Sequence, residues 1–362
     1  MLIGCQQKFW MRCIGQIEKV LIDQYIYQKI HPMISKYCLL IFVVLAPLLL
    51  PAQTGKRHVF NPVSYYKIFT TTTAPVLRIS PGDTVATESV DAGGFDKTGK
   101  HVTERGNPLT GPFFVEGAMP GDVLAVKLLD VRLNRDYAST LNTFIPKIFP
   151  GATTKKAWRG AKRVFWHLDS VSGYSSPPDT LQGLDNVKVA LHPFMGCIGV
   201  APEGSKTSDS GASGEHGGNL DCRFITTGAT LYLPVSHEGA YLLLGDAHAA
   251  QGDGELNGDA LETSMSFAFT VSVIKKGEMN ISMPVVETDD YWIFFGIEKS
   301  LDESLVKSTE YMVNWLQEKY GLSRMAASQV VGPAVEYRIP KIAANKVEVI
   351  AMIKKSVLKG LK

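Results

Sequence analysis

Carboxylates and histidines that could bind a cation or move a proton recur in three groups between His216 and Glu262. Two apolar, strand-like runs separate the groups, and strands that fold back on each other return the chain to the same end of a sheet. Glycines beside each group permit tight turns and a close approach of backbone to a ligand. We therefore predict that the chemistry takes place here. The groups are His216/Asn219/Asp221, Asp246/His248 and Asp253/Glu255.

Asp246 and His248 form the most informative pair. In an extended segment, residues two apart face the same way, so the carboxylate and the imidazole could share one metal ion or one proton. His, Asp and Glu are ligands of catalytic Zn²⁺, which keeps one position for water. The alternative is a histidine held by its neighbour in a structural hydrogen bond. The small and acidic residues that follow, Ala-Ala-Gln-Gly-Asp-Gly-Glu, favour the functional interpretation.

The first group, at His216, follows a Ser/Gly-rich loop and opens a predicted strand. His216 and Asp221 could bind a metal ion, and Asn219 could bind a substrate amide. Asp221 could equally cap a turn, because Asp and Asn are common turn residues. Both interpretations stay open.

Glu88 and Asp91 lie upstream, at the end of a strand predicted over 84–90. Residues three apart do not share a strand face unless the strand ends between them. A buried carboxylate needs a partner, and a cation or a substrate nitrogen would serve. The alternative is a solvated pair at the rim. Glu262 raises the same question in an apolar setting.

Several common catalytic motifs are absent from the sequence. There is no G-x-S-x-G and no phosphate-binding glycine loop followed by Lys-Ser/Thr. His237-Glu238 lacks the second histidine of H-E-x-x-H. These absences disfavour serine hydrolases, zincin proteases and nucleotide-binding proteins.

The composition of the 362 residues is typical of a globular protein: 45% are hydrophobic, 20% are charged, and the formal net charge is +2. Neither the charge nor the basic stretch over 134–163 indicates nucleic-acid binding, because that stretch has no interleaved aromatic residues and no periodic basic face. The 33 glycines and 19 prolines favour many turns. Two Pro-Gly-Asp turns, each followed by a strand-like run, indicate a β-rich fold.

The chain is predicted to become helical near its C-terminus. From about Glu303 the apolar residues follow a helical period, and Gly321 supplies a stop. Ser323 can cap a second, short helix that ends near Gly332-Pro333. We therefore predict a mainly β fold, with a β-sandwich or jelly-roll-like core, a smaller α+β portion from about residue 280, and C-terminal helices.

Residues 33–53 have the pattern of a secretory signal peptide. A short basic region precedes the apolar run from Cys38 to Leu50, which is short for a membrane span. An uncleaved anchor is the alternative. We interpret 1–32 as an extension upstream of the true start and 54–362 as the mature body. Export to the periplasm or outside the cell follows, with no membrane attachment after cleavage. Cys197 and Cys222 could then form a disulfide or remain as two buried thiols.

Six blocks, in the same order along the chain, resemble the acetamidase/formamidase family. The most specific are HGGNLD and GDAHAAQGDGE, and HPFMGCIGVAP adds to them. The others are TVATESVDA, TLYLPV and the helical YMVNWLQEKYGLSRMAA. The chain departs from the family's pattern in its export signal and in 134–187, which matches no block and could shape the substrate pocket.

The resemblance implies hydrolysis of the C–N bond of a short, non-peptide amide such as formamide or acetamide, releasing ammonia and a carboxylate. It also implies a β-rich fold, a homo-oligomer and, for some members, a metal ion. Carried over by motif, the predicted ligands of a divalent cation, Zn²⁺, are Asp246, His248, Asp221 and Asp91. The predicted catalytic residues are Glu255, Asp253, His216 and Glu88.

The predicted mechanism combines the cation with a carboxylate base. The cation polarises the amide carbonyl and activates water, and Glu255 or Asp253 moves the proton to the leaving nitrogen. Glu88 is an alternative ligand of the cation. Two rivals remain open: a metal-independent amidase that uses a carboxylate and a lysine, and an exported β-sandwich that binds a ligand without catalysis.

Overall fold

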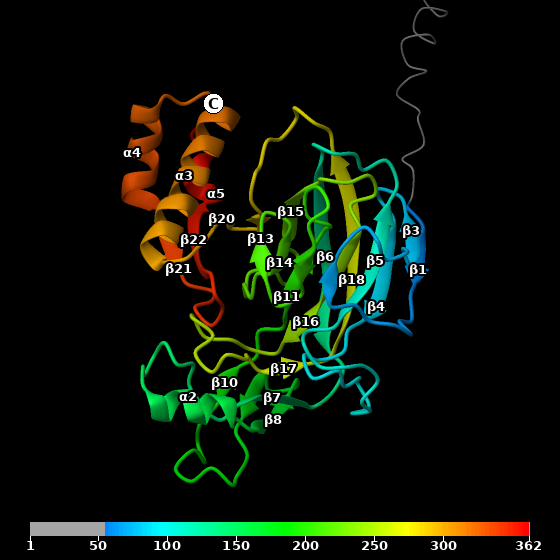
Figure 1. The fold of residues 1–362 in the computed structure, drawn as a ribbon. Coiled ribbons are helices and arrows are strands. Elements are labelled where there is room, and N and C mark those ends of the chain that lie inside the picture. The colour runs from blue at the N-terminus through cyan, green and yellow to red at the C-terminus, as the bar shows by residue number, and fades with distance from the viewer. Residues whose placement is uncertain (1–54, 362) are drawn as a thin grey trace, which may run out of the picture. The chain divides into compact units, whose positions relative to one another are not determined.

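The structure is a computed structural model, and it describes residues 55–361. These residues belong to one compact unit (Figure 1). The predicted extension over 1–32 and the predicted signal peptide over 33–53 lie outside the described residues. Within the described part of the chain, no helix has both the length and the apolarity that a membrane-spanning helix needs.

The first large sheet has nine strands and packs on the larger hydrophobic core. It is antiparallel except where β1 pairs with β4. Its long strands alternate buried and more exposed residues, as in Met265–Ile274, because one face packs on the core. In spatial order the strands are β1 (Arg57–Val59), β4 (Thr84–Glu88), β18 (Met265–Ile274), β6 (Val123–Leu133), β15 (Thr230–Pro234), β19 (Val285–Glu287), β20 (Tyr291–Glu298), β22 (Val347–Lys354) and β21 (Glu336–Arg338).

A second sheet carries the strands on which the candidate residues lie. In spatial order these are β10 (Val189–Ala190), β9 (Tyr174–Ser176), β8 (Arg163–Asp169), β7 (Tyr137–Leu141), β17 (Glu262–Thr263), β16 (Leu242–His248), β11 (Phe194–Gly199), β14 (Gly217–Asn219) and β13 (Ser213–Gly214). β5 (Leu109–Val115) also pairs with β16, and in parallel with β3 (Leu77–Ile79). A third, two-stranded sheet pairs β2 (Ile68–Phe69) with β12 (Ser208–Asp209).

The two large sheets share one hydrophobic core. It contains Leu124 and Phe269 from the first sheet and Phe113, Leu244 and Ile198 from the second, all of them fully or almost fully buried. The rings of Phe113 and Phe269 meet edge to face at 5.3 Å. Burial of this apolar surface is what holds the sheets together, at about 25 cal/mol per Å².

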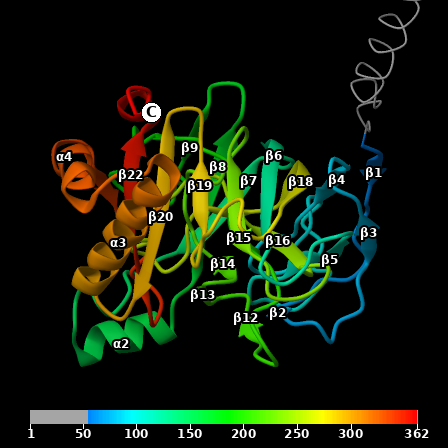
Figure 2. The same ribbon diagram turned by 90° about the horizontal axis from the view of Figure 1, so that it is seen from above.

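The C-terminal helices cover the other face of β20 and β22, as Figure 2 shows for α3. The helices are α3 (Leu301–Tyr320), α4 (Arg324–Ala334) and α5 (Lys355–Leu358). The predicted helix signals are confirmed: Gly321 ends α3 in the left-handed conformation, and the Ser323 side chain caps α4. α4 continues one residue past Pro333, slightly further than predicted.

The predicted mainly β class with C-terminal helices is confirmed. The part after residue 280 does not form a sheet of its own, because β19 to β22 extend the first sheet. The jelly-roll strand order stays a prediction. Cys197 and Cys222 are both buried free thiols, so they do not form the disulfide that the sequence left open.

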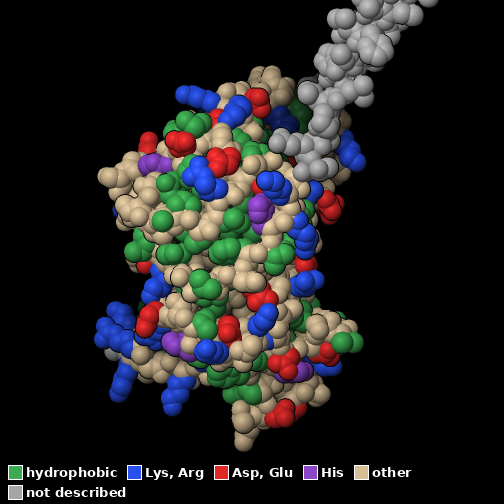
Figure 3. Space-filling view, turned by 90° about the vertical axis from the view of Figure 1, so that its right-hand side faces the viewer, with side chains coloured by type: hydrophobic (Ala, Val, Ile, Leu, Met, Phe, Trp, Pro, Cys, Tyr) green, Lys and Arg blue, Asp and Glu red, His purple; other side chains and the backbone are tan. Residues whose placement is uncertain are grey.

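The stretch over 134–190 forms a lobe of its own at the end of the second sheet, with β7 to β10 and α2 (Ala152–Arg159) (Figure 1). The face of the molecule in Figure 3 shows acidic and basic side chains interspersed, apart from one group of Lys and Arg side chains at its lower left edge. Such mixing agrees with the small net charge of +2.

Candidate metal centre and active site

The register of four neighbouring strands brings the distant candidate residues together. β11 lies between β14 and β16, with Cys197 opposite Asn219 and Phe194 opposite His248. On the far side of β16, His248 pairs with Glu262 of β17. Asp221 follows β14, and its backbone N–H donates to the Gly196 carbonyl at 3.0 Å. The sheet therefore carries the first and second groups of ligands to one place.

Four buried side chains converge there. The Nε2 atom of His248 lies 3.2 Å from Oε1 of Glu262, 3.7 Å from Oδ1 of Asp246 and 4.0 Å from Oδ1 of Asp221. Each of these side chains is at most 3% exposed. Asp221, Asp246 and His248 form a group whose ligand atoms could all reach one metal ion. We call Asp221, Asp246, His248 and Glu262 the acidic cluster.

Gln251 fixes which nitrogen of His248 carries the proton. Its amide nitrogen donates to the carbonyls of Asp221 and Pro340, at 2.9 and 3.0 Å, and a carbonyl can only accept. Its amide oxygen therefore faces Nδ1 of His248, at 3.0 Å, and Nδ1 must donate. The Nε2 lone pair is thus directed at three carboxylates, an arrangement that only a cation or a further proton can stabilise.

The outer oxygens of the carboxylates are already hydrogen-bonded. Asn219 donates to Oδ2 of Asp221 at 2.6 Å, and Asn107 donates to Oδ2 of Asp246 at 2.8 Å. The three inner atoms, which face one another, have no hydrogen-bond partner among the described residues: Oδ1 of Asp221, Oδ1 of Asp246 and Nε2 of His248. In Glu262 the oxygen nearest Nε2 is Oε1, which accepts from the Ala260 N–H at 3.0 Å, while Oε2 has no partner among the described residues. Buried polar atoms without partners are rare and costly, by about 1–3 kcal/mol each. They indicate that a ligand completes the site.

The spacing of the inner atoms suits a metal ion. Two ligand atoms bound about 2.1 Å from one tetrahedral Zn²⁺ lie about 3.4 Å apart. The separations of 3.7 and 4.0 Å from Nε2 to the two aspartates are close to this value. Two carboxylates and one imidazole form a donor set that Zn²⁺ accepts, with a position left for water.

Gly196 leaves the room that a bound ion needs. A Cβ atom at this position would lie 2.5 Å from the Asp246 carbonyl oxygen, 2.8 Å from Cε1 of His248 and 2.9 Å from Oδ1 of Asp221. Around the same point, the non-glycine residues Asn107, Asp221 and Asp246 have positive φ values of 51°, 42° and 53°. Such strained backbone is kept where the surrounding structure and function require it.

We expect Gly196→Ala to abolish metal binding without removing any ligand. The new methyl group must displace a backbone carbonyl and two ligand side chains, because all three contacts are shorter than 3.0 Å. Stoichiometric zinc in the wild type and less than a tenth of it in the variant, measured by elemental analysis, is the expected result. Gly332→Ala in α4 is the matched control, since its Cβ would meet open space. Full zinc content in Gly196→Ala would contradict the assignment.

Burial raises the pKa of both Glu255 and Glu262. Burial, and next the Asp221 carboxylate, raise the pKa of Glu255 well above its ordinary value, although Lys341 opposes this. Burial also raises the pKa of Glu262 to about 8, against the effect of His248. For His248, burial alone would lower the pKa, but Glu262 and Asp246 outweigh it and raise the pKa well above the ordinary value. Glu255 is therefore within electrostatic reach of Asp221.

Lys341 supplies a buried positive charge behind the cluster. Its Nζ atom donates to Oδ2 of Asp221 at 2.7 Å, to the Asn219 carbonyl, and lies 3.4 Å from Oε1 of Glu348. Burial would lower the pKa of Lys341, but Asp221 and Glu348 raise it above its ordinary value. Lys341 is therefore a protonated partner that holds Asp221 in place.

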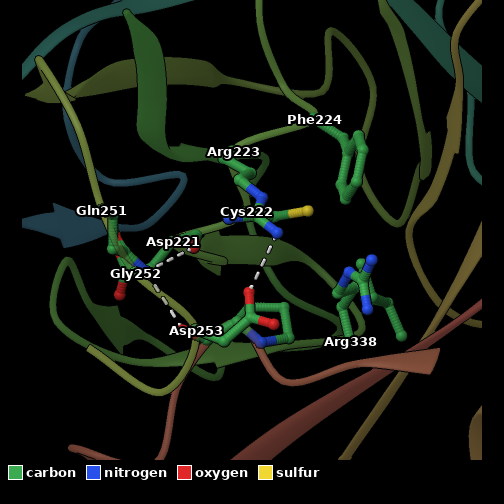
Figure 4. Close-up of a pocket in the computed structure, with 10 residues that line it drawn as sticks. Asp221, Cys222, Arg223, Phe224, Gln251, Gly252, Asp253 and Arg338 are labelled. Carbon is green, nitrogen blue, oxygen red and sulfur yellow. Dashed lines mark hydrogen bonds and ion pairs between the residues drawn. The ribbon is translucent and has the colours of Figure 1, made fainter. Parts of the chain in front are cut away.

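Asp253 faces away from the cluster. Its Oδ1 lies 3.3 Å from the Arg223 guanidinium, and its side chain is 45% exposed. Figure 4 shows this ion pair across a small cavity from Asp221 and Gln251. The cavity volume of about 10 Å³ is close to that of a single water site. Of the two predicted proton carriers, Glu255 is buried and its pKa is affected by Asp221, whereas Asp253 is partly exposed and paired with Arg223.

Three further predicted residues also lie apart from the cluster. Glu88 binds Lys97 at 2.7 Å, and Asp91 binds the buried Arg135 at 2.6 Å and backbone N–H groups of its own turn. His216 is buried against the Phe69 ring, and burial lowers its pKa to about 4. None of the recorded side-chain contacts of these three residues reaches the cluster.

Four residues of the site were not among the predicted site residues. Glu262 had a detectable signal, an acid inside an apolar run, and Gly196 lies in the block HPFMGCIGVAP. Gln251 lies in the long block beside His248, where its spacing could have suggested an orienting partner. Lys341 gave no signal, since one lysine after Pro340 resembles any surface lysine.

Together, the fold and the site define a mainly β protein with a buried carboxylate–imidazole group that could hold a metal ion. The chain belongs to the acetamidase/formamidase family, whose sequence model matches residues 69–211 and 203–337. The match confirms the resemblance of the motif blocks.

Among curated relatives, a formamidase of Methylophilus methylotrophus is 28% identical over 250 residues, which cover 54% of this chain and 60% of that protein. An acetamidase of Mycolicibacterium smegmatis is 28% identical over 221 residues, which cover 47% of this chain and 54% of that protein. The chain thus spans less than two thirds of the length of these relatives.

Solved structures align over more of the chain. A predicted acetamidase/formamidase from Thermoanaerobacter tengcongensis superposes with a TM-score of 0.73 at 25% identity, covering 84% of this chain and 98% of that one. An acetamidase from Bacillus halodurans gives a TM-score of 0.71 at 25% identity, covering 84% and 99%.

Proposed function

We propose that this protein hydrolyses the C–N bond of a small amide to a carboxylate and ammonia, with the help of a divalent cation, Zn²⁺. The observation that carries the proposal is the set of inner atoms of Asp221, Asp246 and His248, buried, close together and without hydrogen-bond partners. Membership of the acetamidase/formamidase family supports the reaction, and the names of the relatives support the substrate class.

Asp221, Asp246 and His248 would hold the cation, with Glu262 next to them. When bound, the cation supplies Lewis acidity for the amide carbonyl. Glu255 would carry the proton between water and the leaving nitrogen. It is buried, and burial together with the Asp221 carboxylate raises its pKa, which favours a carboxyl that can hold a proton. Gln251 keeps His248 in the tautomer that presents Nε2.

Lys341 is the observation that favours a second candidate, a metal-independent amidase with a lysine. A lysine base must lose its proton, and Asp221 and Glu348 hold that proton on Lys341. A lysine base would also leave the inner atoms of Asp221, Asp246 and His248 without partners among the described residues. The metal-assisted candidate therefore accounts for more of the site.

Ammonia release from formamide, acetamide and longer amides tests the proposal. We expect hydrolysis by the zinc-loaded protein, loss of at least 99% of it after a chelator, and recovery when zinc is returned. Full activity of the metal-free protein would favour the lysine candidate. No ammonia from any amide would favour a binding protein without catalysis.

The pH dependence of stability gives a second prediction. Burial raises the pKa of Glu262 to about 8 and that of Glu348 to about 7 from 4.5. Between pH 4.5 and 8 these two folded carboxyls hold protons that the unfolded chain has released, and together they outweigh the one proton that unfolding adds at His216, whose folded pKa is about 4. The stability of the metal-free protein therefore falls as the pH rises.

We expect the unfolding midpoint of the metal-free protein to fall by several degrees from pH 5 to pH 8.5, measured by scanning calorimetry. Zinc should stabilise the protein most at pH 8.5, because binding needs deprotonated ligands. A metal-free midpoint that rises steadily across this range would contradict the burial of these carboxylates.

We also propose that residues 33–53 direct export, as their charged and apolar pattern suggests, and that the mature body forms a homo-oligomer. N-terminal sequencing of the natural protein tests the first point, since a mature end upstream of Met33 would exclude it. Light scattering of the purified body tests the second.

A further inference from the structure

A cavity of about 280 Å³ lies beside the acidic cluster and is lined from two parts of the chain. One wall comes from the lobe over 134–190, with Phe144, Trp166 of β8 and Val189 of β10. The other wall is the loop from Ala250 to Leu261, which includes Glu255. A single water needs roughly 10–15 Å³, so the cavity has room for a molecule many times the size of a water.

The cavity lies next to the candidate site, and its lining contacts the cluster although none of the four cluster residues lines it. Of its lining residues, Gln251 contacts Nδ1 of His248 at 3.0 Å, and the Ala260 N–H donates to Glu262 at 3.0 Å. Glu255, the proposed proton carrier, lines it directly, and its pKa is raised in part by Asp221. Glu255 is therefore the point where the cavity meets the proposed chemistry, and an amide held at Glu255 would have its acyl group in this cavity.

Hydrogen bonds tie the two walls together, so the cavity is built into the fold. Asn257 donates to the Leu141 carbonyl at 2.8 Å, and the Thr140 hydroxyl donates to the Asp259 carbonyl at 3.0 Å. Trp158 of α2 packs on Gly258, where any Cβ would lie 2.0 Å from its ring. Holding one wall against the other is thus one role of this lobe.

The chemistry of the lining selects a neutral, apolar group. The polar side chains are already engaged, since Asp253 pairs with Arg223 and Asp259 pairs with Arg163 at 3.0 Å. A cationic acyl group would find no free carboxylate there except Glu255, and an anionic one would find both arginines already paired. The apolar lining, by contrast, is open: Phe144 is 44% exposed, Val189 39% and Leu256 36%.

We infer that the cavity binds an aryl or large apolar acyl group, so that arylalkyl primary amides such as 2-phenylacetamide are better substrates than acetamide. The inference rests on the proposed function and narrows its substrate class. Trp166 and Phe144 supply the aromatic walls that such a group contacts.

The test compares ammonia release from 2-phenylacetamide and acetamide by the zinc-loaded protein. We expect kcat/KM to be at least tenfold higher for 2-phenylacetamide, since each apolar group that fits a pocket contributes tenfold or more. Trp166→Ala should lower this ratio at least tenfold, chiefly through KM. The matched control is Phe165→Ala, the neighbouring position on β8, which is 56% exposed and does not line the cavity.

Phe144→Ala serves as a second variant, because its exposed ring contributes less to folding. A ratio at or below one in the wild type, or a ratio unchanged in both cavity variants, overturns the inference while leaving the amidase proposal intact. If neither amide is hydrolysed, the amidase proposal fails. Calorimetric binding of 2-phenylacetamide then tests the cavity assignment by itself. A Kd raised tenfold by Trp166→Ala supports the assignment. Equal Kd values for the wild type and Trp166→Ala, or no binding to the wild type, overturn it.

Discussion

Replacing His248 with alanine should lower kcat/KM for amide hydrolysis by at least about 10³ while the protein stays folded. Its Nε2 is the point that the two aspartates and Glu262 surround, and Gln251 orients it. Loss of this ligand removes a cation whose charge stabilisation is worth several kcal/mol, and each 1.36 kcal/mol changes the rate tenfold. Ammonia release and zinc content, measured on the same sample, should fall together.

His167→Ala is the matched control, because His167 is exposed on β8. A folded His248→Ala protein, judged by its β-type circular dichroism, that kept more than a tenth of the wild-type activity would contradict the assignment. Activity lost with zinc content unchanged would mean that His248 moves a proton and does not bind the cation. Activity and zinc content together thus separate two roles that the sequence left open for Asp246 and His248: binding a metal ion and sharing a proton.

Local patterns were sufficient for the elements and for half of the site. Pro-Gly-Asp turns and alternating apolar residues predicted the β-rich fold, and the cap at Ser323 and the stop at Gly321 fixed the helices. Asp246 and His248 were predicted as a pair because a spacing of two is a local property. Their meeting with Asp221 and Glu262 depends on the strand order β14–β11–β16–β17, which places Gly196 between them.

Long-range contacts decided the rest. Asp91 and Glu88 are carboxylates of the kind that bind metal ions. In the structure, however, Asp91 forms an ion pair with Arg135, and Glu88 forms one with Lys97. Lys341 reaches Asp221 only because the chain before β22 passes behind the cluster and pairs Lys341 with Glu348. Residue type and spacing therefore predict which side chains can do chemistry, while the partner that each carboxylate meets decides which ones are free to do it.

Replacing Lys341 with methionine should destabilise the protein more than any other single change at the site. The substitution leaves the carboxylates of Asp221 and Glu348 buried without their shared cation. Breaking a buried ion pair by removing one partner costs about 3–5 kcal/mol. We expect the unfolding midpoint to fall by roughly 5–15 °C, measured by scanning calorimetry at pH 8, where Glu348 is ionised.

Lys346→Met is the control, since Lys346 is exposed on the same segment and its loss should change the midpoint by little. The double variant Lys341→Met/Glu348→Gln removes one of the stranded charges, so it should recover part of the loss, and the recovery measures the coupling between the two residues. A midpoint equal to that of the wild type in Lys341→Met, or a double variant less stable than Lys341→Met, would show that the buried lysine does not compensate these carboxylates.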